Sequence, residues 1–144
     1  MNTNAKTKNK KCERRETRQR GAIRQVFCKI HRPLSAGEVL EHAQSYVPSL
    51  NQATVYRTLK MLSDDGWLTQ VPHVDAGVLY ERSGKDHHHH FYCRDCNRLF
   101  ELAGCALPDG GQAPPGFVIE GHELFVNGLC QECAESAGHT GMKT

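Results

Sequence analysis

Hydrophobic residues recur at helical spacing early in the chain. The first such stretch has an apolar stripe at positions i, i+3, i+4 and i+7: Ile23, Val26, Phe27 and Ile30. Thr17 precedes it and can cap a helix through its hydroxyl. Pro33 follows it, and the residue before a proline avoids the helical region. The pattern therefore predicts a helix from Thr17 to just before Pro33.

Two further helices are predicted from capping residues that stand before apolar stripes. Ser35 followed by Glu38 has the spacing of a capping box. Ser49 or Asn51 caps the next helix, which ends near Gly66. Its apolar residues predict an inward stripe: Val55, Leu59 and Leu62. The same spacing leaves four residues towards solvent: Thr54, Tyr56, Arg57 and Lys60.

Strand patterns follow the third helix. Residues 67–71 and 78–81 are β-prone, and Asp75-Ala76-Gly77 between them supplies a turn. Three helices followed by a β-hairpin form the winged-helix arrangement, in which the third helix enters the major groove of DNA. The second half predicts strands rather than long helices: residues 88–92, 99–102 and 117 to about 126, with a Gly- and Pro-rich loop over 103–116.

These elements predict an α+β protein with an N-terminal winged helix and a small C-terminal α/β domain. The expected boundaries follow the changes in composition. They are a disordered basic tail at 1–14, the winged helix at 15–82, a hinge at 83–86, the second domain at 87–134 and a disordered tail at 135–144.

The net charge of +2 is distributed unevenly. Residues 1–20 hold eight Lys and Arg against two Glu, and residues 84–144 hold four basic against eight acidic residues. A basic front end favours a polyanion such as DNA, although a solvated tail has the same composition. No apolar run approaches the roughly 18 residues that span a membrane, and the polar N-terminus has no secretory signal pattern. We therefore expect a cytoplasmic protein without membrane contact.

Four of the seven cysteines form two Cys-x-x-Cys pairs: Cys93, Cys96, Cys130 and Cys133. Two such pairs match a closed tetrahedral site for a structural Zn²⁺, which fits a reducing compartment better than disulfides do. Four free or disulfide-linked cysteines are the alternative. Cys12 is expected to be an exposed thiol, Cys28 a small core residue, and Cys105 a packing residue in preference to a soft metal ligand.

Four histidines run directly into the first Cys pair. In a strand their side chains alternate, so His88 and His90 share one face, whereas His87 and His89 share the other. We expect His88, His90 and Glu81 to bind one exchangeable ion, with His73 or His31 as the fourth ligand. His87 and His89 would meet His122 in a second site. The alternative is an exposed histidine patch without a metal-binding role.

The third helix presents side chains that suit DNA. Arg57 can read guanine or bind phosphate, Tyr56 can touch a thymine methyl or a phosphate, and Thr54 lies beside them. Basic residues lead into the first helix: Arg15, Arg18 and Arg20. Taken alone, the same face could be a solvated surface or a protein contact.

Two other classes of zinc protein compete with a DNA-binding sensor. A zinc deaminase needs His-x-Glu and Pro-Cys-x-x-Cys, whereas Tyr92 and Leu129 precede the pairs here. His-Glu-x-x-His is absent because His122-Glu123 is followed by Leu124-Phe125-Val126. We therefore expect no enzyme. A structural zinc-ribbon interaction module without regulation is the third candidate.

The sequence resembles the ferric uptake regulator (Fur) family of bacterial metal-sensing repressors over residues 15–134. The resemblance rests on Thr17-Arg18-Gln19-Arg20, Ala53–Leu59, Tyr80-Glu81, His88–Cys96 and Gly121-His122 leading to Cys130. It implies a homodimer in which the C-terminal domain serves dimerisation. It also implies that metal at the hinge closes the dimer onto a palindromic operator in double-stranded DNA and represses metal-uptake genes.

By position, the resemblance assigns DNA contacts to Tyr56 and Arg57 and a minor-groove contact to Arg15. It assigns the hinge sensory site to Glu81, His88 and His90, and a second site to three further histidines: His87, His89 and His122. His replaces the Asp common at position 89, which favours zinc and the zinc-sensing (Zur) branch, with Fe²⁺ as the alternative.

The sequence also departs from the family pattern. Pro33-Leu34 stands where many relatives have a His ligand, and Gly104 where peroxide sensors need an oxygen ligand. Asp109 and Cys105 are the candidates to replace an acidic ligand that many relatives carry after position 101. Ser83 replaces a Cys often present in the zinc-sensing branch.

Overall fold

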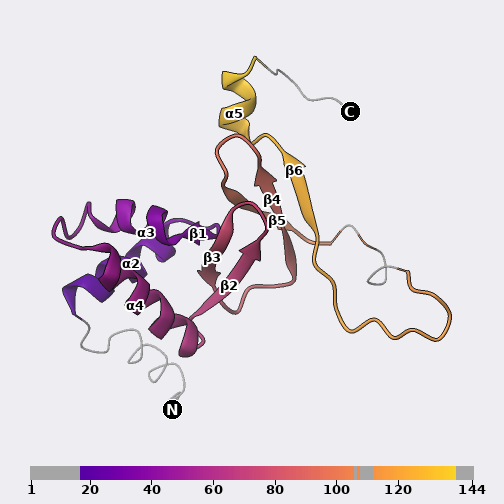
Figure 1. The fold of residues 1–144 in the computed structure, drawn as a ribbon, viewed down its shortest axis with the longest axis horizontal. Helices are drawn as coiled ribbons and strands as arrows, with labels where there is room; N and C mark the ends of the chain where they lie inside the picture. The colour runs from indigo at the N-terminus through magenta and orange to yellow at the C-terminus, as the bar shows by residue number, and fades with distance from the viewer. Residues whose placement is uncertain (1–16, 106, 108–111, 139–144) are drawn as a thin grey trace, which may run out of the picture.

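A computed structural model describes residues 17–105, 107 and 112–138 of the chain (Figure 1). The expected tail at 1–14, Arg15, Asp109 and residues 139–144 lie outside this part. The helices are α2 (Arg18–Lys29), α3 (Ala36–Ala43), α4 (Gln52–Asp64) and α5 (Gln131–Ser136). The strands are β1 (Leu34–Ser35), β2 (Leu68–His73), β3 (Gly77–Arg82), β4 (His88–Cys93), β5 (Leu99–Ala103) and β6 (Phe125–Gly128).

The three N-terminal helices begin at the capping residues that the sequence predicts. The Thr17 hydroxyl accepts the backbone N–H of Arg20, and the Asn51 side chain accepts that of Thr54. Ser35 and Glu38 complete a capping box, each side chain accepting the other residue's backbone N–H at 3.1 and 3.0 Å. Each cap satisfies donors that a helix end leaves unpaired, so these boundaries are fixed locally.

One hydrophobic core joins these helices to the start of the hairpin. Ile23, Val26 and Phe27 of α2 are buried against Val39 of α3, and the inward stripe of α4 is buried with them. Cys28 is exposed beside this stripe, so the expected packing role is wrong. The buried face orients α4, and its opposite face with Tyr56 is left exposed.

The first sheet has the strand order β1-β3-β2. β2 and β3 form the predicted antiparallel hairpin, with Thr69 opposite Glu81. Gly77 has φ +81°, a conformation at this turn that favours glycine. β1 adds to β3 with Leu34 opposite Tyr80, a pairing that the sequence analysis did not predict.

The second sheet has the order β5-β4-β6, so the histidine strand β4 is central. β5 is antiparallel to it and β6 parallel. The prediction of a strand over 117–126 is wrong for most of its length, since β6 begins only at Phe125 and Val118 is 83% exposed. The tail predicted from Glu135 is also wrong at its start, because α5 continues to Ser136. In Figure 1, the segment before β6 runs away from both sheets.

Aromatic and ionic contacts join the two sheets across residues 83–86. His73 at the end of β2 stacks on Tyr92 of β4 with ring centroids 4.2 Å apart. Arg98 reaches Glu38 of α3 at 3.4 Å. A small second core includes Val71 of β2 and Leu99 of β5. The hairpin therefore packs directly on the histidine-bearing sheet. Among the described residues, no helix has the length and apolarity needed to cross a membrane.

Candidate metal centres

The two Cys-x-x-Cys pairs meet at one end of the second sheet. Cys93 ends β4, Cys96 lies in the following turn, Cys130 caps α5 and Cys133 lies within it. All four Sγ atoms lie within 4.8 Å of one another, and those of Cys96 and Cys130 are 3.9 Å apart. A Zn–S distance of about 2.3 Å gives a tetrahedron with edges of about 3.8 Å. The thiols therefore fit one zinc ion with no open position.

Backbone N–H groups stabilise a thiolate in this cluster. Burial alone raises the pKa of the Cys93 thiol, but the backbone N–H groups of Cys96, Cys130 and Asp95 outweigh it and lower the pKa to about 6. Burial and the neighbouring thiols raise the pKa of Cys133. One thiolate therefore forms readily and further ones are opposed by repulsion, which a divalent cation would relieve.

The turn between Cys93 and Cys96 is braced by neighbouring side chains. Asn97 has φ 60°, the left-handed conformation that asparagine tolerates better than most residues. The Tyr92 hydroxyl donates to Asn97 Oδ1 at 2.5 Å. Since His73 stacks on Tyr92, this turn is linked to the hairpin.

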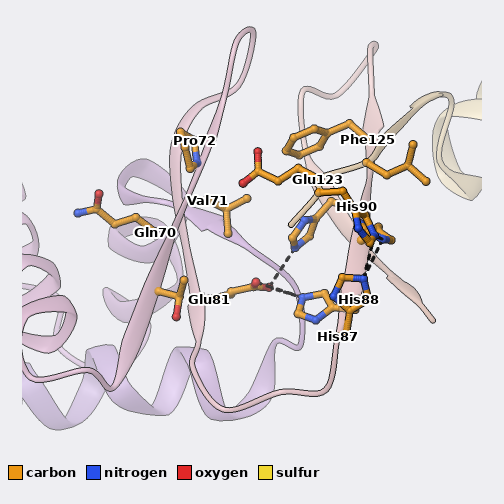
Figure 2. Close-up of a pocket in the computed structure, with 13 residues that line it drawn as sticks. Gln70, Val71, Pro72, Glu81, His87, His88, His90, Glu123 and Phe125 are labelled. Atoms are coloured by element: carbon orange, nitrogen blue, oxygen red, sulfur yellow. Dashed lines mark hydrogen bonds and ion pairs between the residues drawn. The ribbon is translucent and has the colours of Figure 1, made fainter. Parts of the chain in front are cut away.

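A second group lies between the two sheets. Glu81 extends from β3, and its carboxylate oxygens lie 3.1 Å from His88 Nε2 and 3.3 Å from His90 Nε2 on β4 (Figure 2). Zn–N and Zn–O distances near 2.1 Å give tetrahedral edges of about 3.4 Å. The three ligand atoms thus form one face of a suitable coordination polyhedron. The predicted alternation along β4 brings these two histidines together.

The carboxylate of Glu81 is held in the ligating, ionised form. Glu81 is 5% exposed, and burial alone raises its pKa, but the hydrogen bond and charge of His90, the charge of His88 and that of Lys85 together lower it. His88 Nδ1 donates to the backbone oxygen of Asp86 at 2.8 Å, which leaves Nε2 as the ring nitrogen that faces Glu81. This second contact also fixes the ring orientation, as in many metal sites.

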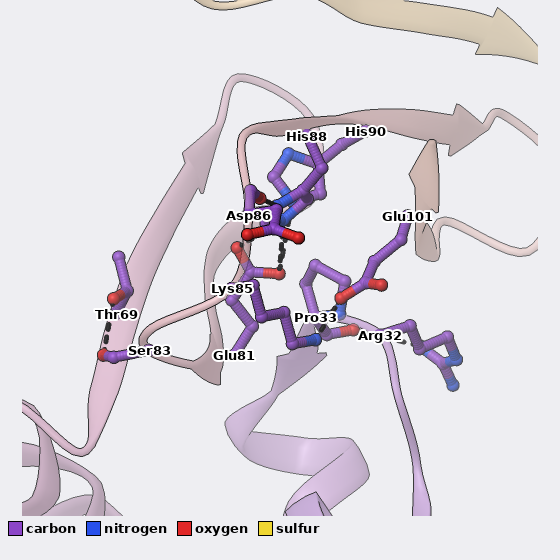
Figure 3. Close-up of polar contacts among 10 residues, drawn as sticks. All are labelled: Arg32, Pro33, Thr69, Glu81, Ser83, Lys85, Asp86, His88, His90 and Glu101. Carbon is purple, nitrogen blue, oxygen red and sulfur yellow. Dashed lines mark hydrogen bonds and ion pairs between the residues drawn. The ribbon is translucent and has the colours of Figure 1, made fainter. Parts of the chain in front are cut away.

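Glu101 is a neighbour of this group that the sequence analysis did not assign. It lies directly opposite His90 in the β4–β5 ladder, so its side chain is on the same face. In Figure 3 its carboxylate forms an ion pair with Lys85 of the 83–86 segment, beside Pro33. Only the register between β4 and β5 reveals that Glu101 lies beside His90, and a single sequence does not give that register.

His73 and His31, the two predicted candidates for the fourth ligand, are not brought into the Glu81 group. His73 stacks on Tyr92, and its Nδ1 accepts the backbone N–H groups of Asp75 and Ala76, both at 3.1 Å. Packing and turn formation therefore account for its position. His31 is exposed at the end of α2.

The opposite face of β4 carries a third group. The Nε2 atoms of His87, His89 and His122 lie 3.1–3.2 Å from one another. Cys105 joins them, with Sγ 3.2 Å from His89 Nε2 and 3.1 Å from His122 Nε2. Cys105 is exposed, so the preference for a packing role is wrong. Burial, followed by the charges of the neighbouring histidines, lowers the pKa of His89 and so favours its neutral ring.

The Glu81 and His87 groups share one cavity. A pocket of about 200 Å³ is lined by residues of β2, β3 and β4 and by the segment entering β6. Both histidine pairs line it, and so does Glu123 (Figure 2). The Cys group does not line this pocket. The two histidine groups are therefore open to ions that enter this pocket.

Candidate DNA-binding side chains lie on α4 and at the start of α2. Tyr56 is 50% exposed, and Arg57 is exposed with Nη2 donating to Thr54 Oγ1 at 3.2 Å. Arg18 and Arg20 are exposed in the first turn of α2. A helix with exposed polar side chains, set on a helical core and flanked by a hairpin, has the form of a major-groove reader. Combined with three clusters of metal ligands, this is the form of a metal-responsive transcription regulator.

The sequence profile of the ferric uptake regulator family matches residues 11–126. The chain belongs to this family. Its members are metal-dependent regulators of transcription that bind DNA as dimers. The resemblance inferred from the sequence and the α+β fold with a winged helix are thereby confirmed.

The names of individual relatives refer to different signals. The chain is 26% identical to the peroxide operon regulator of Bacillus subtilis (strain 168) over 128 residues, covering 87% of this chain and 88% of that protein. It is 30% identical to the ferric uptake regulation protein of Synechococcus elongatus over 128 residues, covering 85% and 87%. The family is therefore shared, whereas the signal sensed is not common to these relatives.

A solved structure shares the fold. The Helicobacter pylori ferric uptake regulator, described as having three functional metal-binding sites, matches with a TM-score of 0.62 at 20% identity. The match covers 90% of this chain and 88% of that one.

Proposed function

We propose that the protein is a homodimeric repressor that binds a palindromic operator when Zn²⁺ occupies the Glu81, His88 and His90 group. The main support is the position of this group. Glu81 belongs to the hairpin that follows the DNA-facing helix, whereas both histidines belong to the second sheet. One ion bound by all three joins the two sheets.

Such an ion would act as a reversible crosslink. The segment between β3 and β4 includes Gly84 at φ +83°, so this connection is not held by regular secondary structure. We assign residues 15–82 to DNA binding, 83–86 to the hinge and 87–134 to dimerisation. In a dimer, restraining each hinge sets the separation of the two α4 helices, which must match half-sites about one DNA turn apart. Metal would favour the DNA-binding arrangement by its differential affinity for it.

The remaining clusters have separate roles in this proposal. The Cys93, Cys96, Cys130 and Cys133 group holds a structural Zn²⁺ that folds the end of the second sheet. Glu101 is the carboxylate best placed to complete the hinge site once it leaves Lys85. His87, His89 and His122 form the second exchangeable site. The cysteine pairs would remain reduced in the cytoplasm.

Zinc is favoured over iron by the ligand types. Two imidazoles and a carboxylate accept Zn²⁺ or Fe²⁺ alike, so the hinge group alone does not choose between them. The other exchangeable cluster contains nitrogen and sulfur ligands only. An iron-responsive repressor with the same hinge remains the competing assignment, and the metal titration below separates them.

The DNA contacts are assigned to the exposed side of α4 and to basic residues before it. Arg57 and Tyr56 would reach base edges or phosphates, with Thr54 beside them. Three arginines would bind the backbone or the minor groove: Arg15, Arg18 and Arg20. An arginine bidentate to guanine contributes about 1–3 kcal/mol of discrimination.

The test is DNA binding measured while Zn²⁺, Fe²⁺ and Mn²⁺ are titrated separately into zinc-loaded dimer, with binding sites selected from random duplexes. Palindromic sites should be enriched only with metal, and Zn²⁺ should act at the lowest free concentration. His88→Ala should abolish the metal dependence while the protein keeps one tightly bound zinc per chain. DNA binding of His88→Ala that still responds to metal would refute the hinge assignment.

Arg57→Ala provides the matched variant. It should weaken operator binding by about 1–3 kcal/mol without changing metal affinity, because its side chain lies on α4 and outside the metal clusters. Unchanged operator binding would remove α4 from the interface. Activation by Fe²⁺ below the concentration at which Zn²⁺ acts would replace zinc with iron.

A further inference from the structure

The third cluster contains a sulfur ligand in addition to its three histidines. Cys105 lies against His89 and His122. This placement raises a question about the kind of ion that the cluster takes. The inference below rests on the proposed function, because it concerns the metal specificity of one of the proposed sites.

The geometry of the four ligand atoms is that of a coordination shell. The three Nε2 atoms and the Sγ atom all lie within 4.8 Å of one another. The N···N distances of 3.1–3.2 Å are close to the roughly 3.3 Å edge of a zinc tetrahedron. Hydrogen bonds cannot satisfy all of these atoms at once, because each Nε2 of a neutral imidazole is either a donor or an acceptor and three of them converge. A cation satisfies all four lone pairs at once.

The elements around the cluster hold its ligands from different directions. His89 belongs to β4 and His87 directly precedes it, so alternation places both on the face opposite the hinge group. Cys105 follows the end of β5, and His122 lies in the segment that leads to β6. His89 is only 4% exposed, so its ring position is set by packing. Cys105 also lies 3.6 Å from the backbone oxygen of Leu107, the acceptor it would use as a protonated thiol.

We propose that Cys105 binds metal as a thiolate and makes this cluster a His₃Cys site that selects Zn²⁺ over Mn²⁺. Thiolate is a soft ligand that suits zinc, whereas carboxylate and water suit manganese. On binding, the Cys105 thiol releases its proton to solvent and its sulfur lone pair forms the metal bond. The sulfur therefore distinguishes this site chemically from the hinge, whose ligands are nitrogen and oxygen.

Cobalt reports this sulfur ligand directly. Co²⁺ is titrated into full-length protein whose cysteine pairs already hold zinc, and near-ultraviolet sulfur-to-cobalt charge-transfer absorption is recorded while zinc release is monitored by mass spectrometry. One new thiolate–cobalt band per chain should develop without zinc release. Cys105→Ser should lack it, and Cys28→Ser, which removes another exposed cysteine, should retain it. A band that survives in Cys105→Ser, or its absence from the unmodified protein, would overturn the proposal.

Alkylation tests the preference for zinc. With Zn²⁺ present, iodoacetamide should modify Cys105 at least about tenfold more slowly than without it, whereas Cys28 in the same sample should react equally fast. Mn²⁺ should give little protection. Equal protection by Mn²⁺, or none by Zn²⁺, contradicts the selectivity. Neither measurement uses DNA, so failure here leaves the repressor proposal standing, and loss of DNA binding leaves this site standing.

Discussion

The Cys93 cluster and the Glu81 cluster both take ligands from β4, yet they are built to opposite designs. The first contains four sulfur ligands at one end of a single sheet, with Cys93 fully buried. The second has three ligands, lies in a pocket and takes Glu81 from the other sheet. A complete shell within one folding unit stabilises that unit. In the proposed function, an incomplete shell shared by two units would respond to the ion concentration through a change in their relative position.

This difference follows from where each ligand is placed in the chain. Each Cys-x-x-Cys pair is positioned by one turn or one helix start, so the geometry within each pair is local. The Glu81 group requires correct packing of β3 beside β4. Its affinity therefore depends on the interdomain contacts, including the His73–Tyr92 stack and the Arg98–Glu38 ion pair.

Cys96→Ser should have the largest effect. Structural zinc contributes apparent binding free energies of about 10–16 kcal/mol in small zinc domains, and loss of one of four thiolates removes much of it. We expect loss of the tightly held zinc and an unfolded second sheet, measured by native mass spectrometry and circular dichroism. Cys28→Ser, at an exposed thiol, is the control and should behave as the unmodified protein. Retention of stoichiometric zinc together with an unchanged unfolding midpoint would show that the cluster is not structural.

Glu81→Gln should have an intermediate effect confined to the hinge. The substitution keeps the shape and removes the ionised carboxylate, so metal affinity there should fall by at least about 100-fold, the upper end of the loss seen for outer-shell partners. Competition with a metal-sensitive dye measures it, and the structural zinc should stay in place. Glu41→Gln, at an exposed carboxylate on α3, controls for the charge change. Equal losses in the two variants would mean that general electrostatics explains the effect.

His73→Asn should have the smallest effect. Asparagine retains an acceptor for the turn between β2 and β3 but loses the stack on Tyr92, so the free energy of unfolding should decrease by about 0.5–1.5 kcal/mol. Hinge metal affinity should remain within about threefold of the unmodified value, because a packing contribution of this size is only partly coupled to binding. Urea unfolding and dye competition provide the two values. A loss of affinity as large as in Glu81→Gln would restore His73 as a ligand.

Local signals in the sequence predicted the helices well. Thr17, Ser35 and Asn51 act within one turn of themselves, so their effects can be recognised without knowing the rest of the fold. Strand alternation likewise predicted which histidines share a face of β4. These features depend on the 3.6- and 2-residue periods of the chain.

Non-local pairings were not predictable in the same way. β1 pairs with β3 through only two residues. β6 runs parallel to β4, and a parallel pairing has no connecting turn that a sequence pattern could indicate. The apolar residues Phe117 and Val118 suggested a longer strand but are exposed. Cys105 was assigned to packing in preference to metal binding because its contacts with His89 and His122 span 16 and 17 residues. The loops that connect them can close in many ways.

The run of four histidines has an evolutionary consequence, because the register of β4 is set by the residues at its C-terminal end. Phe91 and the following residues set the register, so one histidine added to the run would extend the 83–86 connection and leave the four positions nearest Phe91 unchanged. Deleting one histidine would put Asp86 in place of His87. This would alter the proposed His₃Cys cluster and leave the Glu81, His88 and His90 site unchanged. Repeat length can therefore vary one site by single-codon steps while the other site is preserved.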